Sequence, residues 1–190
     1  MPLSSPSPGR SLKHTRAISV EAYSRDDGLW DIDAHITDIK TRDAKLASGV
    51  RLAGSPLHDL RLRVTIDTQL NIVDAEAVSD AVPYFGYCDS IGPVYKNLVG
   101  LNLLQGFRKG LHHRFSGTAG CTHLTELAQV LPTAAIQAFA GEVFGKDGAT
   151  DAIEQEEKPF QLDRCHALRT DGAAVAKYYP RWAVKSSTES

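Results

Sequence analysis

The sequence predicts an α+β fold in which helices pack on one face of an antiparallel sheet of about four strands. Apolar and polar residues alternate with a period of two over residues 16–37 and 60–78, which is typical of strands with one buried face. Beyond Pro83 the apolar residues recur at helical spacing instead. Strands that come first and helices that follow favour one sheet covered on its apolar side.

The sheet is predicted to consist of two hairpins. Each contains two stretches of alternating apolar and polar residues joined by a short polar turn, and the first turn carries an Asp-Gly pair. In order along the chain these are the strand 18–22, the turn 24–28, the strand 30–36, the strand 60–66, the turn 67–71 and the strand 72–78. We expect the polar sides of all four strands to form one solvent-facing surface, which would carry Asp31, Asp33 and His35.

Two helices are predicted after the strands, each from apolar residues three or four positions apart. The first is indicated by Leu104, Phe107, Leu111 and Phe115, and the second by Leu124, Leu127, Ala128 and Leu131. A Gly-rich loop over residues 116–120 separates them, and Pro132 predicts a kink or a restart of the second helix.

A single domain over residues 16–182 is predicted, with tails on both sides. Residues 1–15 are rich in Ser and Pro and residues 183–190 are polar, so neither stretch buries enough apolar surface to offset its ordering entropy. We expect the first tail to be disordered. The stretch 146–159 is acidic and is expected to be a solvated connection inside the domain.

Charge and length exclude several classes of partner. The 190 residues include 21 basic and 23 acidic side chains, so no general positive field is available to hold a nucleic acid or an anionic membrane. No apolar run approaches the length of about 18 residues that a membrane span needs, and the N-terminal residues lack the apolar core of a secretion signal. We therefore expect a cytoplasmic protein with a small-molecule substrate; a homo-oligomer is an open alternative.

The strongest candidate for chemistry is the pair Cys121 and His123, where a Gly-rich loop leads into a predicted helix. The positive end of a helix dipole favours a thiolate and a neutral imidazole, the forms that attack, accept a proton or bind a metal. The alternative is that Cys121 is a small buried apolar residue and His123 bonds to a nearby loop. The three cysteines of the chain are too few and too far apart for a disulfide framework, so each is predicted to be a free thiol or a ligand.

A second candidate is the pair His58 and Asp59, where a loop enters the strongest predicted strand. If that strand begins early, His58 faces the core with Leu60, and Asp59 faces the opposite side. His58 is then either a satisfied core residue or a general base or metal ligand that faces a pocket at the end of the sheet.

Other thiols and imidazoles are weaker candidates. Cys88 follows a Gly between two tyrosines, Tyr84 and Tyr87, which would wall a pocket and donate a hydrogen bond. Cys165 and His166 are adjacent in sequence, so at most one of them is expected to join a site. His112 and His113 are expected at the surface of the first helix, and the sequence has no nucleotide-binding, serine-hydrolase or zinc-ribbon motif.

Four segments together resemble an uncharacterised bacterial group, domain-of-unknown-function family 2889. They are residues 22–40, 53–67, 120–127 and 165–182, which carry the Asp-Gly turn, His58 with Asp59, Cys121 with His123, and Cys165 with His166. The resemblance extends over nearly the whole chain from Arg16 to Trp182. It implies no defined activity, apart from an association with the catabolism of aromatic compounds.

A second resemblance is to the NifU-type iron–sulfur scaffold fold, an antiparallel sheet covered by helices. It implies that the loop before residue 60, Cys88 and Cys121 meet at one end of the sheet. The scaffolds have Cys-Gly-Asp where this chain has residues 57–59, so Asp59 matches and the cysteine is missing. The resemblance thus implies a metal site of Asp59, Cys88 and Cys121, with His58 or His123 added. Two thiolates with an imidazole or a carboxylate would suit Zn²⁺ or iron.

Three functions are compatible with these residues. The first is a small-molecule enzyme of the lyase or isomerase type, with His58 or His123 as general base, Tyr87 in its pocket and a thiol or metal that stabilises negative charge. The second is a metal-binding or iron–sulfur scaffold-like protein without turnover. The third is a partner-binding module without chemistry.

Overall fold

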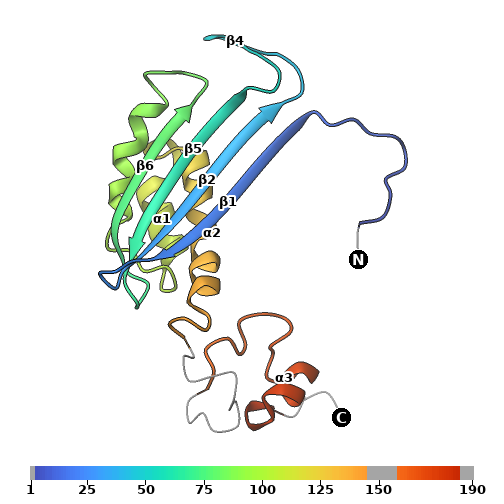
Figure 1. The fold of residues 1–190 in the computed structure, drawn as a ribbon, viewed down its shortest axis with the longest axis vertical. Coiled ribbons are helices and arrows are strands. Elements are labelled where there is room, and N and C mark those ends of the chain that lie inside the picture. The colour runs from blue at the N-terminus through green and yellow to red at the C-terminus, as the bar shows by residue number, and fades with distance from the viewer. Residues whose placement is uncertain (1–2, 145–157, 185–190) are drawn as a thin grey trace. The chain divides into compact units, whose positions relative to one another are not determined.

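The computed structural model describes residues 3–144 and 158–184 (Figure 1). The chain divides into two compact units, Met1–Ala138 and Phe139–Ser190. The predicted single domain, residues 16–182, extends over both units.

The first unit is built on a four-stranded antiparallel sheet, as predicted. Its strands lie in the spatial order β1 (His14–Ser24), β2 (Trp30–Lys40), β5 (Pro56–Ile66) and β6 (Ile72–Ala81). A small hairpin of β3 (Ala44–Leu46) and β4 (Gly49–Arg51) is inserted between β2 and β5. The two long hairpins of the prediction are therefore confirmed, and their strands are longer than the alternating stretches that indicated them.

Alternation in the two central strands separates a buried face from an open one. Ile32, Ala34 and Ile36 of β2 are paired with Val64, Leu62 and Leu60 of β5, and all six are at most 2% exposed. The next residue on the buried face is Asp38 in β2, two positions after Ile36. In β5 it is His58, two positions before Leu60, and Asp38 and His58 are again paired. In β1, Arg16 is paired with Asp38. The register thus places three ionisable residues on the covered face, at the end of the apolar rows.

Helices follow the strands and cover one face of the sheet, with α1 and α2 behind it in the view of Figure 1. They are the 3-10 helix η1 (Asp89–Leu98), α1 (Phe107–Phe115), the 3-10 turn η2 (Gly117–Ala119) and α2 (Thr122–Phe139). The residues that predicted these helices are buried, except Leu104, which precedes α1 and is 40% exposed. The predicted kink or restart at Pro132 does not divide the helix. Leu131 and Ala135, on either side of Pro132, are fully buried, and this packing holds the chain helical across it.

The second unit contains α3 (Ala173–Tyr178) and the 3-10 turn η3 (Pro180–Trp182). Phe144 contacts the rings of both Phe139 and Phe160, at centroid distances of 5.4 and 5.0 Å. Most of the predicted acidic connection (its residues 146–157) and the end of the predicted C-terminal tail (residues 185–190) lie outside the described residues.

The first strand begins at His14, inside the stretch that was predicted to be a tail. Residues 3–13, which precede it, are exposed and have no regular secondary structure. Over residues 3–144 and 158–184, no helix combines the length and the apolar character that crossing a membrane requires.

Candidate functional site

Ionisable side chains converge at one end of the sheet, where β1 and β5 begin, β2 ends and α2 starts. Asp38 lies at their centre, and we call the group the Asp38 cluster. Its members are His14, Arg16, Asp38, His58, Cys121, His123 and Glu126.

The Asp38 carboxylate is buried, with its side chain 3% exposed, and accepts four hydrogen bonds. Oδ1 accepts from Nε2 of His14 at 2.7 Å and from Nε of Arg16 at 2.9 Å. Oδ2 accepts from Nη2 of Arg16 at 2.8 Å and from Nδ1 of His58 at 3.1 Å. Because an ionised carboxylate offers about four acceptor positions, Asp38 is fully satisfied in spite of its burial.

These partners keep Asp38 ionised. Burial is the largest influence and raises the pKa of Asp38, but the hydrogen bonds from Arg16 and His14 and the nearby positive charges outweigh it. The net result is a pKa lowered from 3.8 to about 2. Asp38 is therefore a fixed negative charge at neutral pH, and the nitrogens that contact it must carry protons.

Arg16 joins the sheet to α2. Besides its two bonds to Asp38, its guanidinium donates through Nη1 to Oε2 of Glu126 at 2.6 Å. Its hydrogen bond to Asp38 raises the pKa of Arg16 above its already high ordinary value, so the guanidinium stays charged. The side chain is 35% exposed, so the pair with Asp38 is solvated on one side only.

Two imidazoles, those of His58 and His123, also lie close to Oδ2 of Asp38. The rings of His58 and His123 are 3.8 Å apart between centroids and tilted by 31°. Nε2 of His123 is 3.5 Å from Oδ2 of Asp38. Burial is the main cause that lowers the pKa of His58, and the neighbouring His123 lowers it further, whereas Asp38 acts in the opposite direction. His58 is thus neutral at neutral pH.

Cys121 lies immediately before α2, and its Sγ is 3.9 Å from Nδ1 of His123. Burial raises the pKa of the thiol, but the hydrogen bond with His123 and the backbone N–H groups of Leu124 and His123 lower it by more. The net pKa of Cys121 is below its ordinary value. Cys121 thus lies at the helix start where the sequence placed it, and an activated thiol there stays a prediction.

Tyr95 of η1 holds the start of α2 in place. Its buried hydroxyl donates to the carbonyl of Cys121 at 2.8 Å and accepts from the Cys121 N–H at 2.9 Å. The same oxygen is 2.8 Å from Oγ1 of Thr125. The tyrosine ring stacks on Phe115 at 4.7 Å, and a Cβ at Gly120 would lie 2.6 Å from the Phe115 carbonyl oxygen, so the entry loop packs closely.

The predicted site residues fall into two groups. His58 and His123 lie in contact, and Cys121 is beside His123. Asp59 is one residue from His58 and therefore points to the open face, where it bonds to His35 at 2.6 Å. Cys88 precedes η1, and no interaction joins it to Cys121 or Asp59 within the described residues.

Tyr87 and the C-terminal candidates are exposed, and Tyr87 makes no described contact with the Asp38 cluster. Tyr87 is 82% exposed, in the loop between β6 and η1. Cys165 and His166 are exposed and belong to the second unit. The sequence implied a metal-ligand set of Asp59, Cys88 and Cys121. In the part of the chain that the structure describes, these three residues do not come together as such a set.

A different set of potential metal ligands is assembled. Asp38, His58 and His123 each offer one ligand atom, and all three atoms lie within 4.8 Å of one another. No other group of three His, Cys, Asp or Glu residues meets this condition in the part of the chain that the structure describes.

Four members of the cluster were missed in the sequence, namely His14, Arg16, Asp38 and Glu126. The sequence did contain a signal for Asp38, because it continues the inward series Ile32, Ala34 and Ile36. A carboxylate at an apolar position of a strand needs buried partners. His14 and Arg16 lie on the same face of β1 as Ile18, because they are four and two positions before it. Their contact with Asp38, however, depends on the register of the hairpin.

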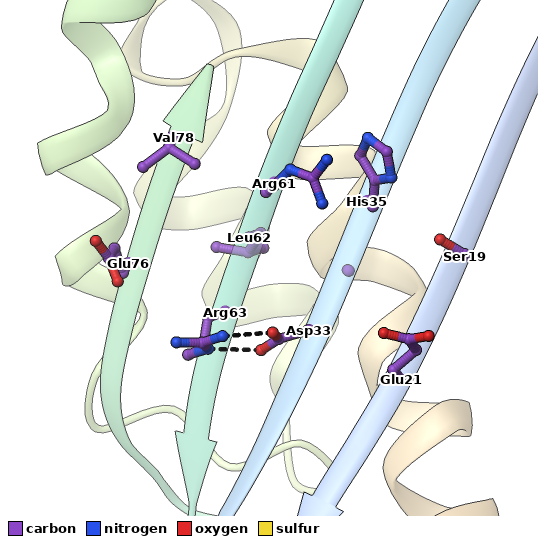
Figure 2. A pocket seen from close by; sticks show the side chains of 10 residues that line it. Ser19, Glu21, Asp33, His35, Arg61, Leu62, Arg63, Glu76 and Val78 are labelled. Carbon is purple, nitrogen blue, oxygen red and sulfur yellow. Dashed lines mark hydrogen bonds and ion pairs between the residues drawn. The ribbon is translucent and has the colours of Figure 1, made fainter. Parts of the chain in front are cut away.

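The open face of the sheet carries a separate cavity of about 490 Å³, shown in Figure 2. It extends over all four long strands and is lined by Ser19, Glu21, Asp33, Ala34, His35, Arg61, Leu62, Arg63, Glu76 and Val78. Its arginines are paired: Arg63 donates two bonds to Asp33, at 2.6 and 2.5 Å, and Arg61 bonds to Asp80 at 3.1 Å. Asp33 and His35 thus lie on the polar face, as predicted, in a lining of paired charges on the side away from the Asp38 cluster.

Comparisons with known proteins identify the family. No curated protein and no solved structure shows a significant match, so the resemblance to NifU-type scaffolds is not shown. The family described as protein of unknown function (DUF2889) matches residues 14–137, which include every member of the Asp38 cluster. The match spans well over half of the chain, and the protein therefore belongs to the DUF2889 family.

Proposed function

We propose that this protein is an enzyme of the lyase or isomerase type that moves a proton on a small organic molecule, with His58 as the general base. The observation that carries the proposal is the contact between Nδ1 of His58 and Oδ2 of Asp38, at 3.1 Å. A carboxylate that orients an imidazole in this way is a recurrent arrangement in enzymes that transfer protons.

The contact determines which nitrogen is available. Asp38 is ionised and can only accept, so the proton of the neutral His58 ring belongs on Nδ1. Nε2 then carries a lone pair, and no hydrogen bond to it is found over residues 3–144 and 158–184. Because burial and His123 lower the pKa of His58, this lone pair is free at neutral pH, as a general base requires.

The partner acid in this proposal is the pair of Cys121 and His123. Their contact of 3.9 Å allows a proton to be shared between Sγ and Nδ1, on the ring that lies against His58. A base and an acid on adjacent groups suit reactions that remove a proton from one carbon and return it to another atom. Such a reaction needs no redox cofactor.

An aromatic substrate is supported by the surroundings of β5. Asp59, next to His58, is paired with Ala81, and the chain that continues from Ala81 carries three exposed aromatic side chains. These are Tyr84, Phe85 and Tyr87, which are 46%, 85% and 82% exposed. Exposed aromatic rings in the loop that follows Ala81 would favour a flat apolar ligand.

The proposal is tested by incubating the full chain in deuterated water with a panel of aromatic acids, alcohols and aldehydes. Proton nuclear magnetic resonance detects both product formation and exchange of carbon-bound hydrogen. With the substrate found, His58→Gln should lower the rate by roughly 100-fold or more, and His35→Gln should leave it unchanged. His35 is a matched control because it also bonds to an aspartate, on the open face. Equal rates in the parent and His58→Gln would exclude His58 as the base.

A further inference from the structure

We propose that Asp38, His58 and His123 also bind one divalent transition-metal ion, through Oδ2, Nδ1 and Nε2 respectively. One ligand atom of each residue lies within 4.8 Å of the ligand atoms of the other two. The site is formed by β2, β5 and the first turn of α2, three rigid elements rather than loops.

The distances match those that one ion imposes. Two ligand atoms about 2.0–2.2 Å from the same ion lie roughly 3.0–3.6 Å apart in octahedral or tetrahedral coordination. Oδ2 of Asp38 is 3.1 Å from Nδ1 of His58 and 3.5 Å from Nε2 of His123. Two of the three separations therefore already fall in this range.

The chemistry of the ligands selects the class of ion. Two imidazoles and one carboxylate suit Zn²⁺, Fe²⁺, Co²⁺ or Ni²⁺, whereas Mg²⁺ and Ca²⁺ prefer sites made of oxygen atoms. Three protein ligands also leave at least one coordination position for water or a substrate, as in catalytic rather than structural zinc sites.

The surroundings support the binding of a cation. His14 and Arg16 fix the carboxylate through Oδ1, and Arg16 also donates to the ligand atom Oδ2 at 2.8 Å. Outer hydrogen bonds of this kind orient metal ligands. The positive charge of Arg16 is shared between Asp38 and Glu126. Two carboxylates against one guanidinium leave one formal negative charge beside the site.

Metal binding would change the role of His58, and this consequence rests on the proposed function. Coordination uses the lone pair of Nδ1, so the ring proton moves from Nδ1 to Nε2 and no proton is gained or lost. Nε2 then has no lone pair and cannot act as a base. The metal-bound and the acid–base forms of His58 exclude each other, and a bound ion would inhibit the proposed reaction.

The chain provides its own control site. His35 and Asp59 form a pair of the same residue types, 2.6 Å apart and partly buried. It lacks the third ligand that His123 supplies, because the structure groups no third His, Cys, Asp or Glu with this pair among the residues it describes. A single imidazole and a single carboxylate bind transition metals weakly, so this pair should not bind.

The test is calorimetric titration of the untagged, metal-depleted full chain with Zn²⁺. We expect one ion per chain with micromolar or tighter affinity, weakened about 100-fold or more by His58→Gln or His123→Gln and unchanged by His35→Gln. Co²⁺ provides a second measurement, since its near-ultraviolet spectrum should show no thiolate charge-transfer band. Equal affinity in the parent and both variants, a thiolate band, or no binding would overturn the metal site.

A measurement on the parent protein keeps the test decisive if a variant fails to fold. In a histidine-edited nitrogen spectrum, Zn²⁺ should shift His58 and His123 and leave His35 unchanged. Shifts confined to other histidines would exclude the site. Failure of the proposed function can be distinguished from failure of the metal site. If only the proposed function is wrong, His58→Gln keeps full turnover and the metal-binding results are unchanged.

Discussion

The imidazole of His58 lies against that of His123, with ring centroids 3.8 Å apart and planes 31° from parallel. The two residues are distant in sequence, one at the start of β5 and the other in the first turn of α2. Two rings this close do not readily carry positive charge together. Their contact therefore influences the protonation of His58, on which the proposed chemistry depends.

Removal of the second ring should raise the pKa of His58. Burial and the charge of His123 are the two leading causes that lower the pKa of His58. The variant His123→Ala removes the second cause and weakens the first, because it opens the His58 ring to water. A proton titration of the His58 ring resonance by nuclear magnetic resonance measures the change. The variant His35→Ala should have no effect, and a His58 pKa that stays the same or falls in His123→Ala would contradict the arrangement.

Neutralising Asp38 should destabilise the fold. In Asp38→Asn the amide accepts through one oxygen only, so at least two of the four donors that now point at the carboxylate lose their partner. We expect a loss of about 3 kcal/mol in the free energy of unfolding, measured with urea. Asp59→Asn, which affects a pair on the open face, should cost less than about 1 kcal/mol. Equal losses in the two variants would show that Asp38 has no special role.

Acid should remove the contribution that ionised Asp38 makes to the free energy of unfolding, over a defined pH interval. The folded-state pKa of Asp38, about 2, lies below the ordinary 3.8, so the unfolded chain binds the proton first as the pH falls. The resulting stability is complete above about pH 4 and is lost as the pH decreases towards 2. It amounts to roughly 2 kcal/mol. Urea unfolding at a series of pH values should show this loss in the parent and a smaller loss in Asp38→Asn, whereas parallel curves would disprove it.

Much of the fold was predictable, because alternation in a strand directly reports which face is buried. The parity of Leu60 and Leu62 placed His58 on the covered side and Asp59 on the open side, and the structure agrees. Helical spacing likewise identified Phe107 and Leu124 as buried positions. These patterns are local, so a single sequence contains them.

The composition of the site was less predictable, since it depends on contacts between distant elements. Arg16 reaches Asp38 only because the hairpin register pairs them, and His123 reaches His58 only because α2 begins at this end of the sheet. The periodicity of apolar residues along the chain predicts neither of these two contacts. Asp38 was nevertheless detectable, because an acid at an inward strand position requires buried partners and is therefore a candidate site residue.

Loss of the Tyr95 hydroxyl should weaken the start of α2. Tyr95→Phe leaves the N–H of Cys121 without its acceptor and removes the bond to the Cys121 carbonyl, in a buried setting. We expect a loss of about 1–2 kcal/mol in unfolding free energy. Amide hydrogen exchange at residues 121–125 should also become faster. Tyr23→Phe, whose hydroxyl bonds to Glu21 at the surface, should change neither quantity, and slow exchange in both variants would contradict this role of Tyr95.

The most direct test of the proposed chemistry is the position of the proton on neutral His58. A long-range proton–nitrogen correlation spectrum of the metal-free protein distinguishes a protonated from an unprotonated ring nitrogen, and His58→Gln identifies the signals. With Asp38 ionised 3.1 Å from Nδ1, we predict a protonated Nδ1 and an unprotonated Nε2, a preference that Asp38→Asn should weaken. A proton on Nε2 of the metal-free parent would contradict the account, because His58 would then have no free lone pair with which to act as a base.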